Sequence, residues 1–351
     1  MKGFASTRGK VFSVAAATLA VAAPLGFTSL TSTASATTGT LTGAGSTLVA
    51  PLEAAWASAY QKSSGNSVSY SPVGSGTGIT DITNRSVDFG ASDAPLTPTQ
   101  ATACGGCVTI PWALTATGVG YNVPGVKGNL RLTGPVIAQI FLGTITTWNN
   151  SAIKKLNPGV NLPSTQITTV HRADGSGDTY AFTNYLDHVS SAFAAKIGPP
   201  ATSVSWPGGI AETGNGGVVS EIKATPGAIG YAAVYYLISQ RVYAAAVQNA
   251  AGKYEYPNLN NIANAASTVT RVPASGVLPI VDPPKKAKIA YPISTFTYCV
   301  VPTSGNKQAP LLQSFINFDI TVGQSFGPKL DFVPLPKVVV KADKGFVSRL
   351  S

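Results

Sequence analysis

Residues 68–95 have the sequence VSYSPVGSGTGITDITNRSVDFGASDAP. At its start, Val68 and Tyr70 alternate with serines, as in a strand with one buried face. The glycine-rich turn 74–78 and a short helical stretch follow, and the apolar residues of 87–91 predict a second strand. A strand, a glycine-rich turn, a helix and a strand in this order are typical of α/β folds with parallel strands.

The same order of elements returns on either side of this stretch. Upstream, apolar residues recur every four positions from Leu48 to Tyr60, after a short strand and the turn 43–47, and predict an amphipathic helix that ends at Gly65. No short-period repeat or low-complexity linker interrupts the chain. We therefore expect two lobes that share crossing strands rather than independent domains joined by a linker. Downstream we expect a strand at 166–170, a turn at 174–179, a helix over 180–186, a buried strand at 228–232 and a helix over 311–318.

The first 36 residues have the composition of a secretory signal peptide. Lys2, Arg8 and Lys10 form a basic start, residues 11–27 are an apolar run, and small residues at 34–36 provide a cleavage site. The alternative, a signal anchor, is disfavoured by the shortness of the apolar run. Since no Cys lies near the cleavage site and no later segment has the length of a membrane span, we expect a soluble, extracytoplasmic mature protein.

The charge of the chain is weak support for an anionic ligand. Its 351 residues include few charged ones, 11%, and the net charge is +10. Removal of the three basic residues of the predicted signal peptide would leave +7 (10 − 3), which suits long-range attraction of anions. A basic stretch at Lys285, Lys286 and Lys288 is expected to be a solvated loop, and no aromatic residues interleave with it as in a nucleic-acid site.

Three cysteines leave several interpretations open. The spacing of Cys104 and Cys107 fits a redox motif, half of a metal site or a loop disulfide. A second pair, which zinc would need, is missing from the sequence, and a structural disulfide is favoured in an exported protein. Cys299 lies in an apolar run and is expected to be a buried free thiol.

Three turns of small and hydroxyl-bearing residues precede predicted helices, at 43–47, 74–78 and 174–179. The first N–H groups of a helix lack internal partners and carry the positive end of its dipole, so they bind oxyanions well. Each turn alone is more typical of an ordinary helix cap. Three in one chain predict an anion site, since a small anion needs donors from several sides. None has the Gly-Lys-Ser/Thr ending of a nucleotide phosphate loop.

Two charged residues sharpen this prediction. Arg172, just before the third turn, could bind two anion oxygens, or it could form a surface salt bridge. Asp93 follows a predicted strand, where it could cap a turn. In an anion site its carboxylate favours a ligand that keeps a proton, such as phosphate, over sulfate, which has no proton to donate.

Short segments spread along the chain carry a resemblance to a known family: Gly43–Pro51, Gly74–Gly76, Val87–Pro95, Phe141–Gly143, Thr147–Asn149, Leu156–Gly159, Arg172–Gly177, Gly214–Gly217, Pro226–Tyr231 and Tyr291–Ser294. With these segments, nearly the whole mature chain, from about residue 41 to about 335, resembles the phosphate-binding proteins of high-affinity phosphate ABC transporters (the PstS family). That resemblance implies a type II periplasmic-binding-protein fold with two α/β lobes closing over one phosphate, lobe I being residues 37–121 plus 294–351 and lobe II residues 122–293.

The resemblance also implies a set of ligands. Thr47 would donate through its hydroxyl and N–H, Leu48 through its N–H and Ser75 from the second turn, while Asp93 would accept the phosphate proton. The other side of the phosphate would be bound by Arg172, Ser176, Gly177 and Asp178. It further implies no cofactor, no metal and no catalytic residue, a monomer, and delivery of phosphate to the transmembrane permease subunits of the transporter.

Two positions depart from the family pattern. Leu48 stands where members often have an aromatic residue, which removes ring packing but leaves a backbone contact. Asp178 stands where well-known members have a Thr donor. Asp178 could cap its helix and offer only its N–H, or it could accept a second phosphate proton and favour the monoanion.

A secreted phosphatase and a surface or sensory module on the same fold are the competing functions. Hydrolysis needs a metal cluster or an activated nucleophile with a base. The sequence has two histidines, His171 beside Arg172 and His188 in a predicted helix, and neither belongs to a cluster with ligand spacing. We therefore expect a binding protein and not an enzyme.

Overall fold

A computed structural model describes residues 39–128 and 130–351. The predicted signal peptide, residues 1–36, and the first residues of the predicted lobe I lie outside the described residues. Within the described part, none of the helices has both the length and the hydropathy that crossing a membrane requires.

The first half of the fold is a sheet in which three parallel strands, β1 (Thr40–Gly45), β2 (Ser67–Ser71) and β3 (Phe89–Ser92), lie side by side. Helix α1 (Ala50–Ser64) joins β1 to β2, and α2 (Ser75–Thr83) joins β2 to β3. These βαβ units confirm the parallel α/β arrangement predicted from residues 68–95, because parallel strands need such crossovers.

Two long antiparallel strands continue the sheet. β12 (Ser294–Pro302) pairs with β3 on one side and with β4 (Cys107–Tyr121) on the other. The register shifts at Thr297/Tyr298, opposite Pro111, since proline has no N–H for the ladder and is accommodated at a bulge. β4 exchanges partners at Ala116/Thr117, where its pairing with β12 ends and pairing with β8 begins.

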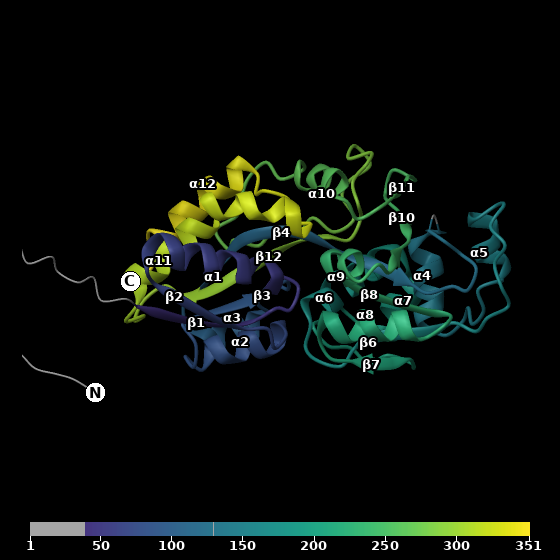
Figure 1. The fold of residues 1–351 in the computed structure, drawn as a ribbon, viewed down its shortest axis with the longest axis horizontal. Helices are drawn as coiled ribbons and strands as arrows, with labels where there is room; N and C mark the ends of the chain where they lie inside the picture. The colour runs from purple at the N-terminus through teal and green to yellow at the C-terminus, as the bar shows by residue number, and fades with distance from the viewer. Residues whose placement is uncertain (1–38, 129) are drawn as a thin grey trace, which may run out of the picture. The chain divides into compact units, whose positions relative to one another are not determined.

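The second half of the fold is built on the far end of β4 (Figure 1). β8 (Ala228–Ala233) pairs with the end of β4, and β6 (Thr168–Arg172) and β7 (Ile210–Glu212) follow as parallel neighbours. Two helices begin after strands of this half, α6 (Gly177–Val189) after β6 and α8 (Gly214–Ala224) after β7. The strand order is β2-β1-β3-β12-β4-β8-β6-β7, and β9 (Tyr243–Ala244) also pairs with β4.

The remaining elements cover these two half-sheets or form a small second sheet. That sheet has the order β11-β10-β5. The elements are α3 (Pro98–Cys104), β5 (Arg131–Leu132), α4 (Gly134–Phe141), α5 (Ser151–Leu156), α7 (Ser191–Ile197), α9 (Val234–Ser239), β10 (Ala246–Gln248), β11 (Tyr254–Glu255), α10 (Leu259–Ala266), α11 (Ala309–Asp319), the 3-10 helix η1 (Val322–Leu330) and α12 (Lys337–Val347).

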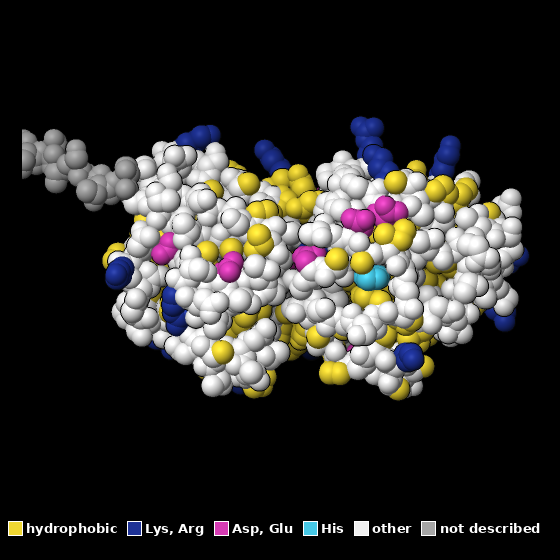
Figure 2. Space-filling view, turned by 90° about the horizontal axis from the view of Figure 1, so that it is seen from below, with side chains coloured by type: hydrophobic (Ala, Val, Ile, Leu, Met, Phe, Trp, Pro, Cys, Tyr) yellow, Lys and Arg dark blue, Asp and Glu magenta, His cyan; other side chains and the backbone are white. Residues whose placement is uncertain are grey.

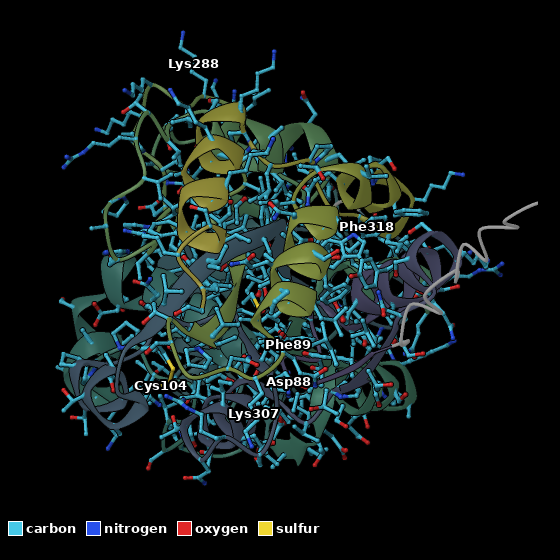
Figure 3. The ribbon with its side chains drawn as sticks, turned by 90° about the vertical axis from the view of Figure 1, so that its left-hand side faces the viewer. Asp88, Phe89, Cys104, Lys288, Lys307 and Phe318 are labelled. Carbon is cyan, nitrogen blue, oxygen red and sulfur yellow. A yellow bond between two sulfur atoms is a disulfide. The ribbon has the colours of Figure 1, made fainter. Side chains whose placement is uncertain are left out.

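Aromatic side chains form the core of each half. Phe89 packs edge-on against Trp112 with ring centroids 5.7 Å apart, and Trp56 lies 5.3 Å from Trp112. Phe89 and Phe318, labelled in Figure 3, extend this cluster to α11: Phe89 lies 5.8 Å from Phe315, and Phe318 lies 5.6 Å from Tyr60. In the second half, the stacked rings of Phe182 and Tyr231, 4.5 Å apart, serve the same purpose. Such pairs stabilise a core beyond the area they bury.

Most predicted elements are confirmed, with boundaries that shift by a few residues. The helix predicted to end at Gly65 does so, because Gly65 takes the left-handed conformation (φ 76°) and its N–H reaches the carbonyl of Gln61. That helix begins at Ala50 rather than at Leu48, since Pro51 fits only its first turn. The predicted strand at 166–170 starts two residues later, at Thr168.

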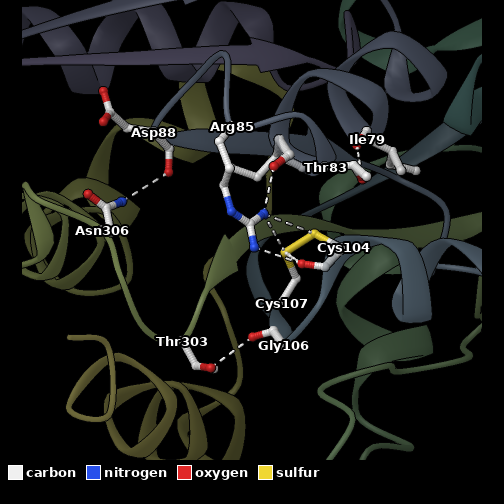
Figure 4. Close-up of a disulfide and its surroundings, with 10 residues drawn as sticks. Ile79, Thr83, Arg85, Asp88, Cys104, Gly106, Cys107, Thr303 and Asn306 are labelled. Atoms are coloured by element: carbon white, nitrogen blue, oxygen red, sulfur yellow. Dashed lines mark hydrogen bonds between the residues drawn. A yellow bond between two sulfur atoms is a disulfide. The ribbon is translucent and has the colours of Figure 1, made fainter.

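A disulfide joins Cys104 and Cys107 at the junction of α3 and β4. The Arg85 guanidinium lies against it, donating to the carbonyl oxygen of Cys104 at 2.7 Å and approaching both sulfur atoms at 3.5–3.6 Å (Figure 4). Cys299 is a buried free thiol in β12. The basic residues Lys285, Lys286 and Lys288 lie exposed in a loop, and Lys288 projects away from the body of the protein in Figure 3.

Candidate functional site

The first predicted anion turn lies between β1 and α1. Gly45 ends the strand at φ 143°, and a Cβ there would meet the Ala91 carbonyl oxygen at 2.0 Å, so only glycine lets the turn lie this close to β3. Ser46, Thr47 and Leu48 follow, all buried. They precede the helix instead of opening it, because Val49 is the residue before its first turn. The Leu48 N–H donates to Ser46 Oγ at 3.0 Å.

The second turn brings Ser75 against the third. Gly74 precedes α2, and the buried Ser75 is its first residue. Ser75 Oγ accepts hydrogen bonds from the N–H of Gly177 at 3.1 Å and from the N–H of Asp93 at 3.3 Å. The backbone N–H of Gly76 donates to the carbonyl of Gly175 at 2.9 Å. The bonds between Ser75 or Gly76 and the third turn join parts of the chain that are far apart in sequence.

The third turn connects β6 to α6. Ser176 is the N-cap of α6, and its hydroxyl accepts from the N–H groups of Asp178 at 3.1 Å and Thr179 at 3.4 Å. The hypothesis that Asp178 caps this helix is therefore wrong: the cap position lies two residues earlier, where a serine side chain satisfies the first free N–H groups. The Asp178 side chain is left for other partners.

Arg172 lies at the end of β6 between two carboxylates. Its Nε donates to Asp174 Oδ1 at 2.7 Å, its Nη2 pairs with Asp174 Oδ2, and its Nη1 lies 3.4 Å from Asp178 Oδ2. The side chain of Arg172 is 1% exposed. Burial lowers the pKa of Arg172, but the hydrogen bond and charge of Asp174 and the charge of Asp178 outweigh it, so the pKa lies above its usual value. The guanidinium stays charged.

Asp93 has one satisfied and one unsatisfied oxygen. Ser46 Oγ donates to its Oδ2 at 2.6 Å, and Ser75 Oγ lies 3.5 Å from the same oxygen. Its Oδ1 is buried and accepts no hydrogen bond from any residue in the described part of the chain. Burial raises the pKa of Asp93 to about 7, and the Asp178 charge acts in the same direction, while the side chains of Ser46 and Thr297 and the charge of Arg172 oppose both. An orphaned buried carboxylate oxygen is costly, and a ligand proton would satisfy it.

Asp178 differs from Asp93 in having partners on both oxygens. Thr117 Oγ1 donates to Oδ1 at 2.7 Å, and Asn215 Nδ2 donates to Oδ2 at 2.7 Å, beside the guanidinium of Arg172. Burial raises the pKa of Asp178, while the charge of Arg172 and the hydrogen bonds from Thr117 and Asn215 oppose the rise. With three donors already bound, little acceptor capacity remains on Asp178.

All eight residues predicted to bind an anion meet in one buried network. Thr47 connects to Asp178 and Arg172 through Asn215, and Asp93 connects to Gly177 through Ser75. Leu48 joins through Ser46, and Ser176 through the N–H of Asp178. Their role as anion ligands remains a prediction.

The family model of the PBP superfamily domain matches residues 30–321. The phosphate-binding protein PstS of Xylella fastidiosa (strain Temecula1) is 38% identical over 304 residues, which is 86% of this chain and 83% of that protein. PstS of Methanocaldococcus jannaschii is 33% identical over 82% of this chain and 80% of its own length.

The chain belongs to the PstS family of phosphate-binding proteins.

Solved structures show that this member of the PstS family has the two-lobed fold of periplasmic binding proteins, as predicted. A high-affinity periplasmic phosphate-binding protein (PfluDING) bound with phosphate superposes with a TM-score of 0.71 at 21% identity, over 87% of this chain and 93% of that one. A putative phosphate ABC transporter substrate-binding protein from Clostridium perfringens superposes with a TM-score of 0.62 at 21% identity, over 85% and 100% of the two chains.

Sequence reasoning missed four residues of the site: Ser46, Thr117, Asn215 and Tyr236. Asn215 had a usable signal, because it stands in Gly214-Asn215-Gly216-Gly217, a fourth turn of small residues at a helix start. Ser46 belonged to the first turn but was assigned no role. Tyr236, whose hydroxyl donates to the Thr47 carbonyl at 3.0 Å, and Thr117 stand in segments with no such pattern.

Proposed function

We propose that the protein captures inorganic phosphate outside the cytoplasm and delivers it to the permease of an ABC importer. Relatives named as phosphate-binding proteins support this function, since they are 33–38% identical over most of the chain. The observation that carries the proposal is the buried, unsatisfied Oδ1 of Asp93 beside hydroxyl and N–H donors of three turns.

The selectivity for phosphate over sulfate follows from Oδ1 of Asp93. Phosphate near neutral pH keeps at least one proton and donates it to Asp93, whereas sulfate would bring a second lone pair against the carboxylate. A site built to accept a ligand's hydrogen bond rejects the analogue that lacks it strongly, because the buried group is then left unpaired. Arsenate has the same shape and protonation and should bind like phosphate.

The donors for the other phosphate oxygens come from both halves of the fold. Thr47 Oγ1 accepts hydrogen bonds from the side chain and the backbone N–H of Asn215, so its own hydroxyl proton is available to an anion. The Ser75 hydroxyl has a long contact, 3.5 Å, to Asp93 Oδ2, and an anion can compete for its proton. The N–H groups of Gly177 and Asp178 lie in the first turn of α6, at the positive end of its dipole. In this structure they donate to Ser75 Oγ and Ser176 Oγ, which a bound anion would replace as their acceptor. Arg172 provides the one positive charge.

The charged side chains alone do not attract a phosphate. Arg172 contributes one positive charge, and Asp93, Asp174 and Asp178 contribute three negative ones, a net of −2 when all are ionised. Binding must therefore come from hydrogen bonds, backbone dipoles and the shared proton. Since three protein donors occupy Asp178, we infer that it serves mainly as a counter-charge to Arg172 and that Asp93 accepts the phosphate proton.

Access to the site requires the lobes to separate. The eight ligands are buried, and hydrogen bonds such as Gly76 N–H to the Gly175 carbonyl link turns of the two half-sheets. We infer that residues 37–121 with 294–351 move against residues 122–293. β4 changes its strand partner at Ala116/Thr117, close to residue 121, where the predicted lobe I ends. This change supports a hinge there. The mature protein is expected to act as an extracytoplasmic monomer.

Calorimetric titration of phosphate-stripped protein with phosphate, sulfate and arsenate tests the function. Tight binding of phosphate and arsenate is expected, with little binding of sulfate at pH 8. Equal affinity for sulfate, or no binding at all, would overturn the proposal. A parallel assay with a chromogenic phosphate ester distinguishes a binding protein from a secreted phosphatase, because only a phosphatase would hydrolyse the ester.

A further inference from the structure

Asn215 is a fully buried residue that touches three separate elements. It lies in the first turn of α8, and its exposed fraction is 0%. Its Nδ2 donates to Thr47 Oγ1 at 2.9 Å and to Asp178 Oδ2 at 2.7 Å, while its Oδ1 accepts from the N–H of Ala233 at 2.7 Å. One amide thus links the first anion turn, the third anion turn and strand β8.

The chemistry of these partners fixes how the amide is oriented. The N–H of Ala233 can only donate, so it must face the amide oxygen, and the carboxylate of Asp178 can only accept while ionised, so it must face the NH₂ group. Both NH₂ protons are then assigned, one to Asp178 and one to Thr47. If the amide oxygen and nitrogen were exchanged, the NH₂ group would face the N–H of Ala233, and the amide oxygen would face the carboxylate of Asp178.

This orientation determines the direction of the Thr47 hydroxyl. Thr47 Oγ1 accepts from the Asn215 side chain at 2.9 Å and also from the Asn215 backbone N–H at 3.3 Å. A hydroxyl has two lone pairs and one proton, so with both lone pairs occupied the proton must be donated to a third group. The Tyr236 hydroxyl donates to the Thr47 carbonyl at 3.0 Å, a further contact between this turn and the opposite half of the fold.

We propose that Asn215 is a positioning residue of the phosphate site: it aims the Thr47 hydroxyl proton at the bound anion and holds Asp178 against Arg172. This inference rests on the proposed function. Because Thr47 and Asn215 belong to opposite halves of the fold, their hydrogen bond forms only when the lobes close. Asn215 therefore couples closure to completion of the donor set and slows release of phosphate.

Asn215→Asp is the most informative variant, because it has the same shape and keeps an oxygen for the N–H of Ala233. An ionised carboxylate at this position would have no proton for Thr47 or Asp178, and we expect about a 10- to 100-fold weaker phosphate affinity at pH 8, the size expected for lost hydrogen bonds to a charged group. The ratio of the dissociation constants of variant and wild type should shrink as pH falls to 5.5, since the protonated carboxyl can donate again.

The kinetics provide a second readout. Stopped-flow measurements should show that Asn215→Asp raises the dissociation rate of phosphate and leaves the association rate within a factor of about three, as is usual for changes inside one interface. In a double-mutant cycle with Thr47→Val, the losses in affinity should be much less than additive, because Asn215 acts largely through the Thr47 hydroxyl.

Asn157→Asp is the matched control. Asn157 is a buried asparagine of the same half that bridges the backbone of Arg131 and Ile153, away from the site. Its substitution should lower the melting temperature but leave the phosphate dissociation constant and its pH profile unchanged.

If Asn215→Asp does not fold, Asn215→Ser is the second variant, because serine keeps one hydroxyl donor. Its phosphate affinity should also fall, and phosphate should again dissociate faster than from the wild type.

The outcomes are distinct. A wild-type protein that binds no phosphate refutes the proposed function itself. A wild type that binds phosphate, with an Asn215→Asp variant of equal affinity from pH 5.5 to 9, refutes only the positioning role. A loss of affinity that does not vary with pH and adds fully to that of Thr47→Val would also refute it, because that is what general destabilisation produces.

Discussion

Asp93 and Asp178 are both buried carboxylates in the same network, and they differ in their hydrogen bonds. Asp178 has donors on both oxygens and pairs with Arg172, while Asp93 has an oxygen without a donor among the described residues. Burial raises the pKa of Asp93 to about 7. Near neutral pH its proton is therefore easily exchanged with a ligand, whereas the donors around Asp178 favour the charged form.

Replacing Asp93 by Asn tests that difference. The amide offers an NH₂ group where we propose that the carboxylate accepts the phosphate proton, so phosphate affinity should fall by about 10- to 100-fold, as expected for a lost hydrogen bond to a charged group. Sulfate affinity should rise, because its unprotonated oxygens can now accept from the amide. Calorimetry at pH 8 measures both constants, and unchanged selectivity between the two anions would contradict the role of Asp93 as proton acceptor.

The pH dependence of sulfate binding follows from the same pKa. Sulfate brings no proton, so it can bind only when Asp93 is protonated. With a pKa of about 7, the protonated fraction falls about tenfold for each pH unit above that value. The sulfate dissociation constant should therefore rise about tenfold per unit from pH 7 to 9 and level off below pH 6. Competition titrations measure it, with Asp93→Asn as the variant that should lose the slope; a pH-independent constant in the wild type would refute the argument.

At the scale of elements, α1 and α11 pack together around buried acids. Glu53 of α1 and Asp319 of α11 are 0% exposed, and their carboxyl oxygens have no hydrogen-bond partner in the part of the chain that the structure describes. Burial raises the pKa of Glu53 to about 8. Burial also raises the pKa of Asp319, and the charge of Glu53 raises it further. Such a pair is tolerated only while it holds protons.

This arrangement predicts that stability falls with rising pH. The folded state keeps the Glu53 proton up to about pH 8, while the unfolded chain releases it near its ordinary pKa of 4.5, so stability is full below pH 4.5 and decreases up to pH 8. Glu53→Gln cannot ionise and should raise the unfolding free energy at pH 8.5 by several kcal/mol, with little gain at pH 5. Urea titrations at both pH values measure it. The partly exposed Asp187→Asn is the control; an equal effect of Glu53→Gln at both pH values would contradict the prediction.

The elements also show what sequence can and cannot reveal. The glycine turn at α2 could be predicted, because Gly74 has a local physical reason to precede the helix. The start of a helix near residue 177 was also predicted, but its cap is Ser176 and not Asp178. The partners of Asp178 could not, since Thr117 and Asn215 lie 61 and 37 residues away along the chain. Their contacts depend on the sheet order, which brings β4, β6 and α8 together, and no local pattern encodes that order.

For the whole molecule, burial separates the two signs of charge. Among the described residues, five acidic side chains are buried, whereas Arg172 is the single buried basic one. The surface is therefore more positive than the count of 24 basic and 14 acidic residues indicates. Figure 2 shows lysine and arginine side chains projecting along the edge of one face, with few acidic ones between them. The outside attracts anions, although the charged groups of the site itself sum to a negative value.

This separation predicts that salt acts on the capture of phosphate and not on its release. Long-range attraction is screened over about 10 Å at 0.1 M salt, whereas hydrogen bonds inside a closed site are not. When salt rises from about 20 to about 500 mM, which shortens this length several-fold, the association rate of phosphate should fall several-fold and the dissociation rate should stay constant. Replacing Lys285, Lys286 and Lys288 by Gln should lower the association rate at low salt. Stopped-flow fluorescence gives both rates; salt-dependent release with constant capture would mean that the charges of the site, rather than those of the surface, control phosphate binding.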